Sequence, residues 1–400
     1  MIAKKIIYIM PSCSENSPGI LKKNVQRVEA LVANGCNVKG LFFTKDHEDV
    51  RDIHPNILKI GYNDTFLFRN FPLLWRLIPM YTNWIHLKMI NKWVSKEKVN
   101  YKQTFIYFRY PSASKFVLKL IKKWKNKGCK IAFEMNGKEE AFLERDIRDN
   151  PADLFAKKRL KYEKKYAPLL MKSIDLVVGV SNEIGAYYAD MGGAHKYVLS
   201  NGFDINSVEV IEQEIKPNTT IKFCLVSGSP NYWNGCDRYI EAFKKYSGNE
   251  KIELHLIGSF NPEYIKTIPE YIVTHGMLSK EKLDEILPQM HVGLGSCGLH
   301  RVDLTETNVL KVREYLSRGL PVIIGYRDTD LNFDEPLDFV ANVSADEQAI
   351  ELPPIITWLK ELYEKHPNLN KEIRAFASKK LSYHHKIHEF VTYLEKNKYV

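Results

Sequence analysis

Short apolar runs alternate with helical periodicities along the first half of the chain. Residues 5–10 form an apolar run typical of a buried strand, and apolar positions at helical spacing follow it until Gly35 ends the period. A second apolar run over residues 37–43 completes a strand–helix–strand unit, whose crossover makes the two strands parallel. Later runs predict strands over residues 104–108, 130–134 and 176–180 and a helix over residues 114–126.

The same pattern starts again in the second half. Apolar runs predict strands over residues 221–226, 253–257, 272–275, 291–294 and 322–325, and helices over 237–246, 280–287 and 308–317. Residues 204–220 are polar and acidic, contain Pro217 and show no period, so we expect a linker there. The pattern predicts an α/β fold with two doubly wound, Rossmann-like domains, residues 1–203 and 221–375, that face each other across a cleft.

Charge is divided unevenly between the two halves. Residues 1–203 carry 35 Lys and Arg against 19 Asp and Glu, whereas the remainder carries 23 against 29. Between Phe66 and Lys130, 15 basic residues alternate with Phe and Trp, and Glu97 is the single acid. This stretch suits contact with an anionic membrane or a lipid-diphosphate-linked acceptor, and it is equally typical of an aromatic core under a lysine-rich surface. Without a nucleic-acid-binding motif, nucleic acid is not an expected partner.

The composition also excludes several classes of protein. The six cysteines are scattered without a CxxC pair, which argues against a disulfide framework or a cysteine-based zinc site and suits a reducing compartment. The first apolar run is too short for a signal peptide, and no apolar run has the roughly 18 residues that a membrane-spanning helix needs. We therefore expect a globular, cytoplasmic protein.

The candidate chemistry is concentrated in residues 305–323. Glu306 and Glu314 stand eight residues apart, and a helix that begins near Thr305 or Thr307 would place them about two turns apart near one face. Free amides at the start of that helix would receive a diphosphate, and an ionised Glu314 would accept hydrogen bonds from both hydroxyls of a ribose. Taken alone, the pair is also typical of the solvent face of an amphipathic helix.

This segment and its surroundings resemble the signature of retaining glycosyltransferases with the GT-B fold, the large family marked by two glutamates separated by seven residues. The Gly-x-Pro-Val sequence that begins at Gly319 is similar to the family's helix end and following strand. Other segments resemble, in order, its first glycine-bearing loop, the end of its N-terminal domain, the start of its C-terminal domain and a bacterial surface-polysaccharide subgroup: residues 17–19, 175–181 with 199–204, 226–242 and 298–301.

The resemblance implies a role for each matching residue on the donor side. Glu314 would hold the donor ribose, and Glu306 would be a catalytic residue beside the transferred sugar. Many relatives have a lysine where this chain has Asn234, so another cation must hold the phosphates; Lys311 is the first choice, and a solvated helix lysine is the alternative. The remaining donor-side candidates are Gly228, Ser229, Arg238, Arg301, Thr307 and Asn308.

On the N-terminal side, Glu134 ends a predicted strand and is a candidate catalytic or acceptor-side residue, although a glutamate that caps a loop is as common there. Gly19 and Asn136 are expected beside the acceptor. The resemblance implies retention of anomeric configuration, C-terminal helices near residues 376–400 that complete the first domain, and no cofactor or metal. Asp328-Thr329-Asp330 matches a metal-binding motif of a different glycosyltransferase fold, and we expect a turn there.

The function implied is that of a hexosyltransferase-type enzyme that moves a sugar from a UDP- or GDP-linked donor to a lipid-linked or saccharide acceptor. Capsule, exopolysaccharide or O-antigen assembly is the expected setting, with the enzyme cytoplasmic or peripheral on the inner face of the plasma membrane. Two alternatives stay open, namely a nucleotide-sugar epimerase on the same fold and a non-catalytic scaffold that binds nucleotide sugars or anionic lipid.

Overall fold

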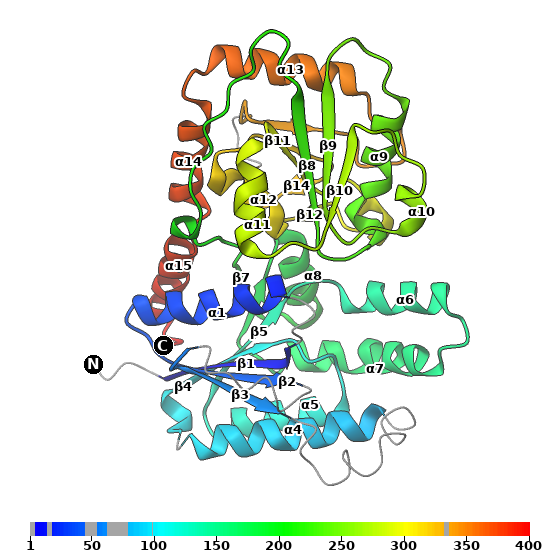
Figure 1. Ribbon diagram of the computed structural model, residues 1–400. Helices are drawn as coiled ribbons and strands as arrows, with labels where there is room; N and C mark the ends of the chain where they lie inside the picture. The colour runs from blue at the N-terminus through cyan, green and yellow to red at the C-terminus, as the bar shows by residue number, and fades with distance from the viewer. Residues whose placement is uncertain (1–4, 14–17, 45–53, 62–78, 98, 332–335) are drawn as a thin grey trace. The chain divides into compact units, whose positions relative to one another are not determined.

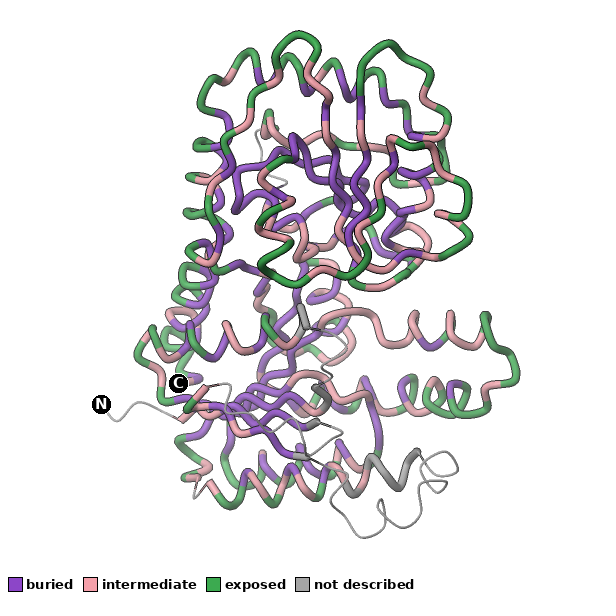
Figure 2. The backbone as a smooth tube through the Cα atoms, viewed as in Figure 1, coloured by how far each residue is buried: buried purple, intermediate pink, exposed green. Residues whose placement is uncertain are grey.

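The computed structural model describes residues 5–13, 18–44, 54–61, 79–97, 99–331 and 336–400. The chain divides into two compact units, each with its own parallel sheet (Figure 1). Unit 1 comprises Met1–Leu199 and Lys386–Val400, and unit 2 comprises Ser200–His385. In both units the buried residues follow the strands (Figure 2), so each sheet is the centre of its own hydrophobic core.

The sheet of unit 1 has seven parallel strands in the order β3-β2-β1-β4-β5-β6-β7. The order reverses between β1 and β4, so the carboxyl ends of these strands flank a topological switch point, where open α/β sheets bind ligands. The strands are β1 (Lys5–Cys13), β2 (Asn37–Thr44), β3 (Ile57–Gly61), β4 (Thr104–Arg109), β5 (Lys130–Met135), β6 (Leu176–Gly179) and β7 (His195–Val198).

Helices cover both faces of this sheet. On one face, Phe390 of α15 packs against the rings of Tyr107 and Tyr197, with centroids 5.6 and 5.1 Å away, and His388 bonds to Asn34 at the end of α1. On the other face, Trp124 of α5 is fully buried, and α5 packs between α4 and α7. The helices are α1 (Pro18–Ala33), α4 (Pro79–Lys96), α5 (Lys115–Asn126), α6 (Glu139–Asp149), α7 (Leu154–Met171), α8 (Asn182–Gly192) and α15 (Tyr383–Lys396).

Unit 2 repeats the design with six parallel strands in the order β10-β9-β8-β11-β13-β15, and its switch point lies between β8 and β11. The strands are β8 (Ile221–Ser227), β9 (Ile252–Gly258), β10 (Ile272–Gly276), β11 (Val292–Leu294), β13 (Val322–Ile324) and β15 (Val340–Asn342); β12 (Glu306–Thr307) pairs separately with β14 (Arg327–Asp328). The helices are α9 (Cys236–Lys245), α10 (Pro262–Ile265), α11 (Lys280–Ile286), α12 (Leu310–Arg318), α13 (Leu352–Lys365) and α14 (Leu369–Lys380).

The predicted doubly wound α/β architecture is confirmed, and the unit boundaries differ in detail from the expected ones. The expected linker, residues 204–220, lies within unit 2. It buries Ile205, Val208 and Ile211, and the amide of Ile211 donates to the carbonyl of Arg318 at the end of α12. The chain returns to unit 1 at Lys386, inside α15, rather than near residue 376.

The basic aromatic stretch predicted from the sequence is described in part. Phe66, Phe68, Phe71 and Trp75 lie outside the described residues. Within α4, the ammonium of Lys88 lies 3.5 Å from the ring centroid of Trp84. None of the described helices combines the length and the apolar character that crossing a bilayer would require.

A buried carboxyl in unit 1 makes a pH dependence testable. Glu163 of α7 accepts hydrogen bonds from the Tyr110 hydroxyl (2.5 Å) and the Ala113 amide (2.7 Å), and burial raises its pKa from 4.5 to about 7. The folded state therefore holds a proton that the unfolded state releases, so this contribution to stability is complete below pH 4.5 and is lost as pH rises through 7.

We expect Glu163→Gln to remove this dependence. The free energy of unfolding of wild type minus that of the variant should fall with pH between 4.5 and 7, by at most about 1.4 kcal/mol per pH unit. Urea unfolding at a series of pH values measures the difference, which isolates this carboxyl from other titrating groups. A difference that is constant across that window would contradict the prediction.

Candidate functional site

The switch point of unit 2 is held together by Asn234. Its Nδ2 donates to the Ser229 carbonyl (3.3 Å), its Oδ1 accepts from the Ser296 hydroxyl (3.2 Å), and its carbonyl accepts from the Cys297 amide (3.0 Å). Asn234 thus joins the loop after β8 to the loop after β11. Gly235 follows with φ of +69°, and a side chain there would lie 2.5 Å from the Cys297 sulfur. A residue that departs from the resemblance therefore has a structural role.

The loop after β8 presents backbone amides. Gly228 is exposed, and a Cβ atom added there would meet nothing within 4 Å. Within the described part of the chain, the amides of Gly228 and Ser229 donate to no acceptor, while the Ser229 carbonyl accepts from the Ser227 hydroxyl at 2.8 Å. Because the amides of Gly228 and Ser229 are open, they suit hydrogen bonds to an anion that approaches this loop.

Helix α12 begins later than the sequence predicts. Thr307 lies with Glu306 in the short strand β12, and Asn308 lies before the helix, where its side chain bonds to the Asn201 amide (2.9 Å) and the Thr329 hydroxyl (2.9 Å). Val309 then occupies the N-cap position with extended backbone and no capping hydrogen bond from its side chain. The expectation that Glu306 stands at the mouth of the helix is corrected: it lies in a strand four residues before α12 and is buried.

Glu314 is oriented by a neighbouring arginine. Its Oε1 accepts from Nη2 of Arg318 (2.8 Å), one turn later on α12, and Arg318 also pairs with Asp284 of α11. No hydrogen bond to Oε2 is present among the described residues, and the side chain is 22% exposed. One oxygen of the carboxylate is therefore held, and the other is available to a ligand.

Lys311 is the candidate phosphate cation on α12. Its ammonium nitrogen is buried and makes no hydrogen bond in the described part of the chain, and it lies in the first turn of α12. Burial lowers the pKa of this lysine from its usual value of 10.5, and the ionisable groups that act on it are the thiols of Cys236, Cys297 and Cys224. A buried ammonium without a counter-ion is costly, so an anion that enters here would be strongly favoured.

Lys311 and Glu314 of α12 both lie close to strand β8. The pKa of the Cys224 thiol in β8 is raised to about 12, first by burial, and both Glu314 and Lys311 act on it electrostatically. The hydroxyl of Tyr315, the residue after Glu314 on α12, accepts a hydrogen bond from the Val226 amide near the end of β8 (2.8 Å). This bond fixes α12 over the switch point, and Gly293 of β11 leaves space for the ring, since a Cβ there would approach it to 2.3 Å.

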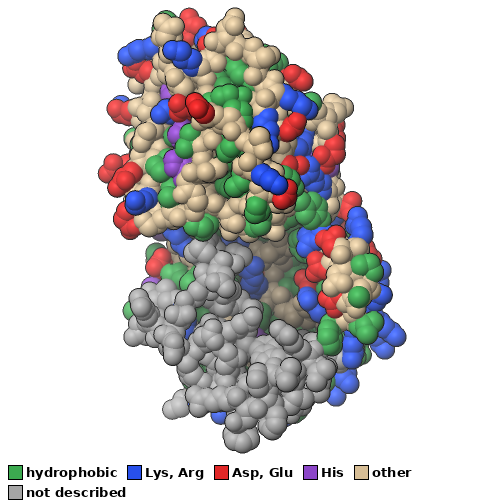
Figure 3. Space-filling view, turned by 45° about the vertical axis from the view of Figure 1, so that its right-hand side comes forward, with side chains coloured by type: hydrophobic (Ala, Val, Ile, Leu, Met, Phe, Trp, Pro, Cys, Tyr) green, Lys and Arg blue, Asp and Glu red, His purple; other side chains and the backbone are tan. Residues whose placement is uncertain are grey.

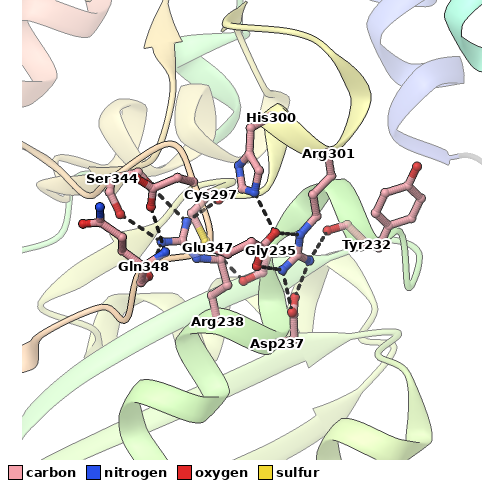
Figure 4. Close-up of polar contacts among 11 residues, drawn as sticks. Tyr232, Gly235, Asp237, Arg238, Cys297, His300, Arg301, Ser344, Glu347 and Gln348 are labelled. Carbon is pink, nitrogen blue, oxygen red and sulfur yellow. Dashed lines mark hydrogen bonds and ion pairs between the residues drawn. The ribbon is translucent and has the colours of Figure 1, made fainter.

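The other two candidate phosphate-binding residues, Arg238 and Arg301, already donate hydrogen bonds to protein acceptors (Figure 4). Arg301 forms paired hydrogen bonds with Asp237 (2.9 and 2.8 Å) and with Glu347 (2.6 and 2.7 Å), which raise its pKa. Arg238 is buried and donates to the carbonyls of Cys297, Ser344 and Gln348 at 2.5–2.9 Å. Both arginines fasten loops around α9, which leaves Lys311 as the available positive charge of the three.

Asp328 and Asp330 are also committed. The guanidinium of Arg313, on α12, bonds to both oxygens of Asp328 (2.8 and 2.7 Å) and to Asp330 (2.6 Å). Asp328 and Arg313 are completely buried. The motif that matches a metal site therefore closes an ion-pair network that holds α12 against β14. The described residues contain no cluster of three or more metal-ligating side chains.

A second polar cluster lies at the carboxyl edge of the sheet in unit 1. Glu134 of β5 is buried and pairs with Arg27 of α1. Its carboxylate also accepts from the Tyr8 hydroxyl (2.8 Å) and the Asn136 side chain (2.9 Å). Lys23 of α1 donates to Asn136 at 2.8 Å and lies 3.8 Å from Glu134. The cluster thus joins β1, β5 and α1 beside the switch point, and Gly19 lies in the first turn of the same α1.

Three cations surround this single carboxylate, because Arg109 at the end of β4 lies 4.0 Å from Glu134. Burial alone would raise the pKa of Glu134, but Arg27, Lys23 and Arg109 outweigh it and hold the pKa well below its usual range. The pKa of Lys23 is lowered by its own burial and by Arg27. A carboxylate stabilised in this way is a weak proton acceptor, so Glu134 is better suited to positioning these cations than to general base catalysis.

Comparison with known proteins identifies the fold. No family model matches the sequence, and no curated protein matches it. The chain is similar in structure to a sucrose-phosphate synthase from Thermosynechococcus elongatus, with a TM-score of 0.68, 14% identity and 99% of both chains covered. The fold is that of the GT-B glycosyltransferases.

Two further solved structures agree with this assignment. The lipopolysaccharide outer core galactosyltransferase WaaB has a TM-score of 0.59 at 12% identity, over 98% of this chain and 99% of that one. HepE from Anabaena, in complex with UDP and glucose, has a TM-score of 0.59 at 11% identity, over 98% of this chain and the whole of the other.

Sequence reasoning missed the residues that support the candidates. Arg318, which orients Glu314, and Arg313, which holds Asp328, both lie on α12, and a cation four residues after Glu314 was a visible signal. Lys23, Arg27 and Arg109 were missed as well. Their signal was that Arg109 and Glu134 end adjacent parallel strands, whose carboxyl ends meet at one sheet edge.

The unpartnered ammonium predicts opposite effects on stability and on ligand binding. We expect Lys311→Met to raise the stability of the ligand-free protein by about 1 kcal/mol, since it removes an uncompensated buried charge, which corresponds to roughly 2–4 °C in Tm. The same variant should lose most of the stabilisation that a nucleoside diphosphate gives to wild type. Thermal melts with and without nucleotide measure both effects. A variant that is less stable than wild type and still stabilised by nucleotide would contradict this role.

Proposed function

We propose that the protein is a retaining glycosyltransferase that moves a sugar from a nucleoside-diphosphate donor to a lipid-linked or saccharide acceptor. The observation that carries the proposal is the buried, unpartnered ammonium of Lys311 at the start of α12, between Glu306 and Glu314, at the switch point of unit 2. An α/β sheet binds ligands at this point, and a cation with no counter-ion specifies an anionic one.

The diphosphate, the ribose and the sugar of a nucleotide sugar each have a matching group in unit 2. The diphosphate would take the Lys311 ammonium, the uncapped amides of α12 and the amides of Gly228 and Ser229. The ribose hydroxyls would donate to the oxygen of Glu314 that Arg318 leaves available. Buried Glu306 would contact hydroxyls of the transferred sugar. Thr307, through its carbonyl, and Asn308, through its side chain, would support this site rather than bind the donor.

The acceptor would bind in unit 1 through an anionic group. Lys23, Arg27 and Arg109 exceed the charge of Glu134 by two, and one Nη of Arg109 is buried without a hydrogen-bond partner in the described part of the chain. A phosphate of a lipid-diphosphate-linked acceptor would supply the missing negative charge. Asn136, already bonded to Lys23, would line the same position.

The reaction would need no protein nucleophile. The bond between the anomeric carbon and the diphosphate oxygen breaks, the acceptor oxygen bonds to that carbon on the same face, and the acceptor proton passes to the departing diphosphate. The protein would contribute orientation and electrostatic support for the charge that develops on the diphosphate, mainly from Lys311 and the α12 amides. Retention of configuration at the anomeric carbon follows from attack on the face that the leaving group vacates.

The setting that we propose is bacterial surface-polysaccharide assembly on the cytoplasmic face of the plasma membrane. WaaB is named for lipopolysaccharide outer core galactosyl transfer, and HepE was solved with UDP and glucose. These names support a hexose donor linked to UDP for this chain, and GDP remains the second base to test.

Thermal melts against a panel of nucleoside diphosphates and their sugars test the donor site. We expect one base to raise the Tm of wild type, and Glu314→Ala to reduce that shift because the ribose contact is lost. Glu306→Ala should retain most of the shift and abolish transfer, since its contacts are to the sugar. Glu361→Ala, on the exposed face of α13, is the matched control and should behave as wild type. Wild-type turnover in both site variants would overturn the proposal.

Product analysis separates the proposed reaction from its alternatives. A transferase consumes the nucleotide sugar in proportion to glycosylated acceptor, whereas an epimerase changes the sugar without any acceptor. A scaffold would bind the donor and turn over neither.

The acceptor site predicts a charge-selective defect. We expect Arg109→Gln to lower kcat/KM at least tenfold with a diphosphate-linked acceptor, because a charge-assisted hydrogen bond contributes about 1.5–3 kcal/mol. The change should be much smaller with a neutral saccharide acceptor, and the nucleotide-induced Tm shift should be unchanged. Arg148→Gln, at an exposed position of α6, is the control. Equal losses with both acceptors would contradict an anionic acceptor site.

A further inference from the structure

Three neighbouring helices of unit 1 carry almost no acidic residues. Helices α4, α5 and α7 contain three, five and six Lys or Arg residues, and the single acid among them is Glu163. Glu163 is buried under Tyr110 and Ala113, so it offers no negative charge to the surface. Because α5 packs between α4 and α7, the three helices form one layer, which we call the basic layer.

The lysines of the basic layer point away from the sheet. Helix α5 buries Val117, Leu120, Ile121 and Trp124 on one side, so Lys119, Lys122 and Lys123 are exposed on the other. Helix α7 buries Ala156, Ala167 and Leu170, and its exposed residues include Lys158, Lys161 and Lys165. Helical spacing of three and four residues puts the last three on one stripe.

These charges are largely uncompensated. Acids of α6 pair with Arg159 and Lys164, at 3.0 Å to Glu139 and 2.8 Å to Glu144. In the described part of the chain, no ion pair reaches Lys157, Lys158, Lys161 or Lys165 on α7, nor Lys119, Lys122 or Lys123 on α5. A field of one sign that the protein leaves unpaired is an attractive surface for a polyanion.

Apolar side chains lie within the same surface. Leu154, Phe155 and Leu169 of α7 are 72%, 41% and 43% exposed, and they account for three of the four large exposed hydrophobic residues of the described chain. Leu154 and Leu169 share the stripe of Lys158, Lys161 and Lys165 by helical spacing. Basic and hydrophobic side chains, with acidic side chains among them, cover the α6–α7 hairpin at the right-hand side of Figure 3.

An open hollow adds a further feature. It has a volume of about 620 Å³ and lies between α6 and α7, with Ile147 and Leu160 as its apolar lining. The lysines around it are Lys157, Lys161, Lys164 and Lys165. Ammonium groups above an apolar floor suit a phosphate headgroup and the first part of its acyl chain.

We infer that the basic layer, with α7 at its centre, is a docking surface for an anionic phospholipid bilayer. The expected contact between Phe66 and Lys130 covers α4 and α5, and the structure adds α7, which lies beyond that stretch. Lysines are attracted to an anionic surface, and the exposed leucines and phenylalanine would insert among the headgroups. Nucleic acid fits the charge but not the exposed aliphatic side chains, since the polyanion contacts of nucleic acid are polar. This inference does not depend on the proposed reaction.

The test is co-sedimentation of the full chain with vesicles of phosphatidylcholine, with and without phosphatidylglycerol. Wild type should bind only the anionic vesicles, and binding should weaken as salt rises. Lys158→Glu/Lys161→Glu/Lys165→Glu should lower the partition coefficient at least about tenfold. The matched control is Lys251→Glu/Lys266→Glu/Lys282→Glu, at exposed positions of unit 2, which changes net charge equally and should bind as wild type.

A second variant separates insertion from charge. Leu154→Ser/Leu169→Ser should retain the salt-dependent encounter and bind anionic vesicles several-fold more weakly than wild type. Thermal melts confirm that each variant is folded, and an intact nucleotide-induced Tm shift shows that the donor site is unaffected. The inference is overturned if wild type ignores anionic vesicles, if the α7 variant and the control bind equally, or if a single-stranded oligonucleotide displaces the protein from the vesicles.

Discussion

The ion pair between Arg313 and Asp328 fixes the geometry on which the proposed donor site depends. Both side chains are completely buried, and the guanidinium also reaches Asp330. Removal of one partner from such a pair typically costs about 3–5 kcal/mol, because the remaining charge is stranded in the interior. The pair ties α12 to β14, and β14 in turn pairs with β12. Glu306 lies on β12, and Lys311 and Glu314 lie on α12. The relative positions of these three side chains therefore follow from the buried contact between Arg313 and Asp328.

Charges in unit 2 fall into two groups, and the difference between them indicates function. Arg238, Arg301 and Arg313 donate hydrogen bonds to carboxylates and carbonyls, and so they hold loops and helices in place. Lys311 is equally buried at its ammonium and has no such acceptor. A buried charge without a counter-ion destabilises the folded protein, whereas a bound diphosphate would neutralise that charge and stabilise the complex.

Unit 1 also has cations that outnumber their carboxylate partners, both in a buried cluster and on its outer helices. At the carboxyl edge of its sheet, three cations share the single carboxylate of Glu134 and leave an excess of positive charge in a buried position. On the outer helices, many lysines share no carboxylate at all. The first excess suits a small anionic group of an acceptor, and the second suits an extended anionic surface. An enzyme whose acceptor is carried by a lipid would use both, since the surface brings the protein to the substrate that the buried cluster then selects.

The doubly wound fold and the helix after Glu306 followed from the sequence, because hydrophobic period and turn residues act locally. Strand β3 and helices α6 and α7 did not, since their segments are short or rich in charged residues and show little apolar period. The roles of Arg238 and Arg301 were likewise hidden, because residues distant in sequence, such as Ser344 and Glu347, supply their acceptors. The sequence determined which charges exist and the order of the elements. Only the tertiary structure decided which of those charges are neutralised by a partner and which are left for a ligand, because pairing depends on contacts between segments far apart along the chain.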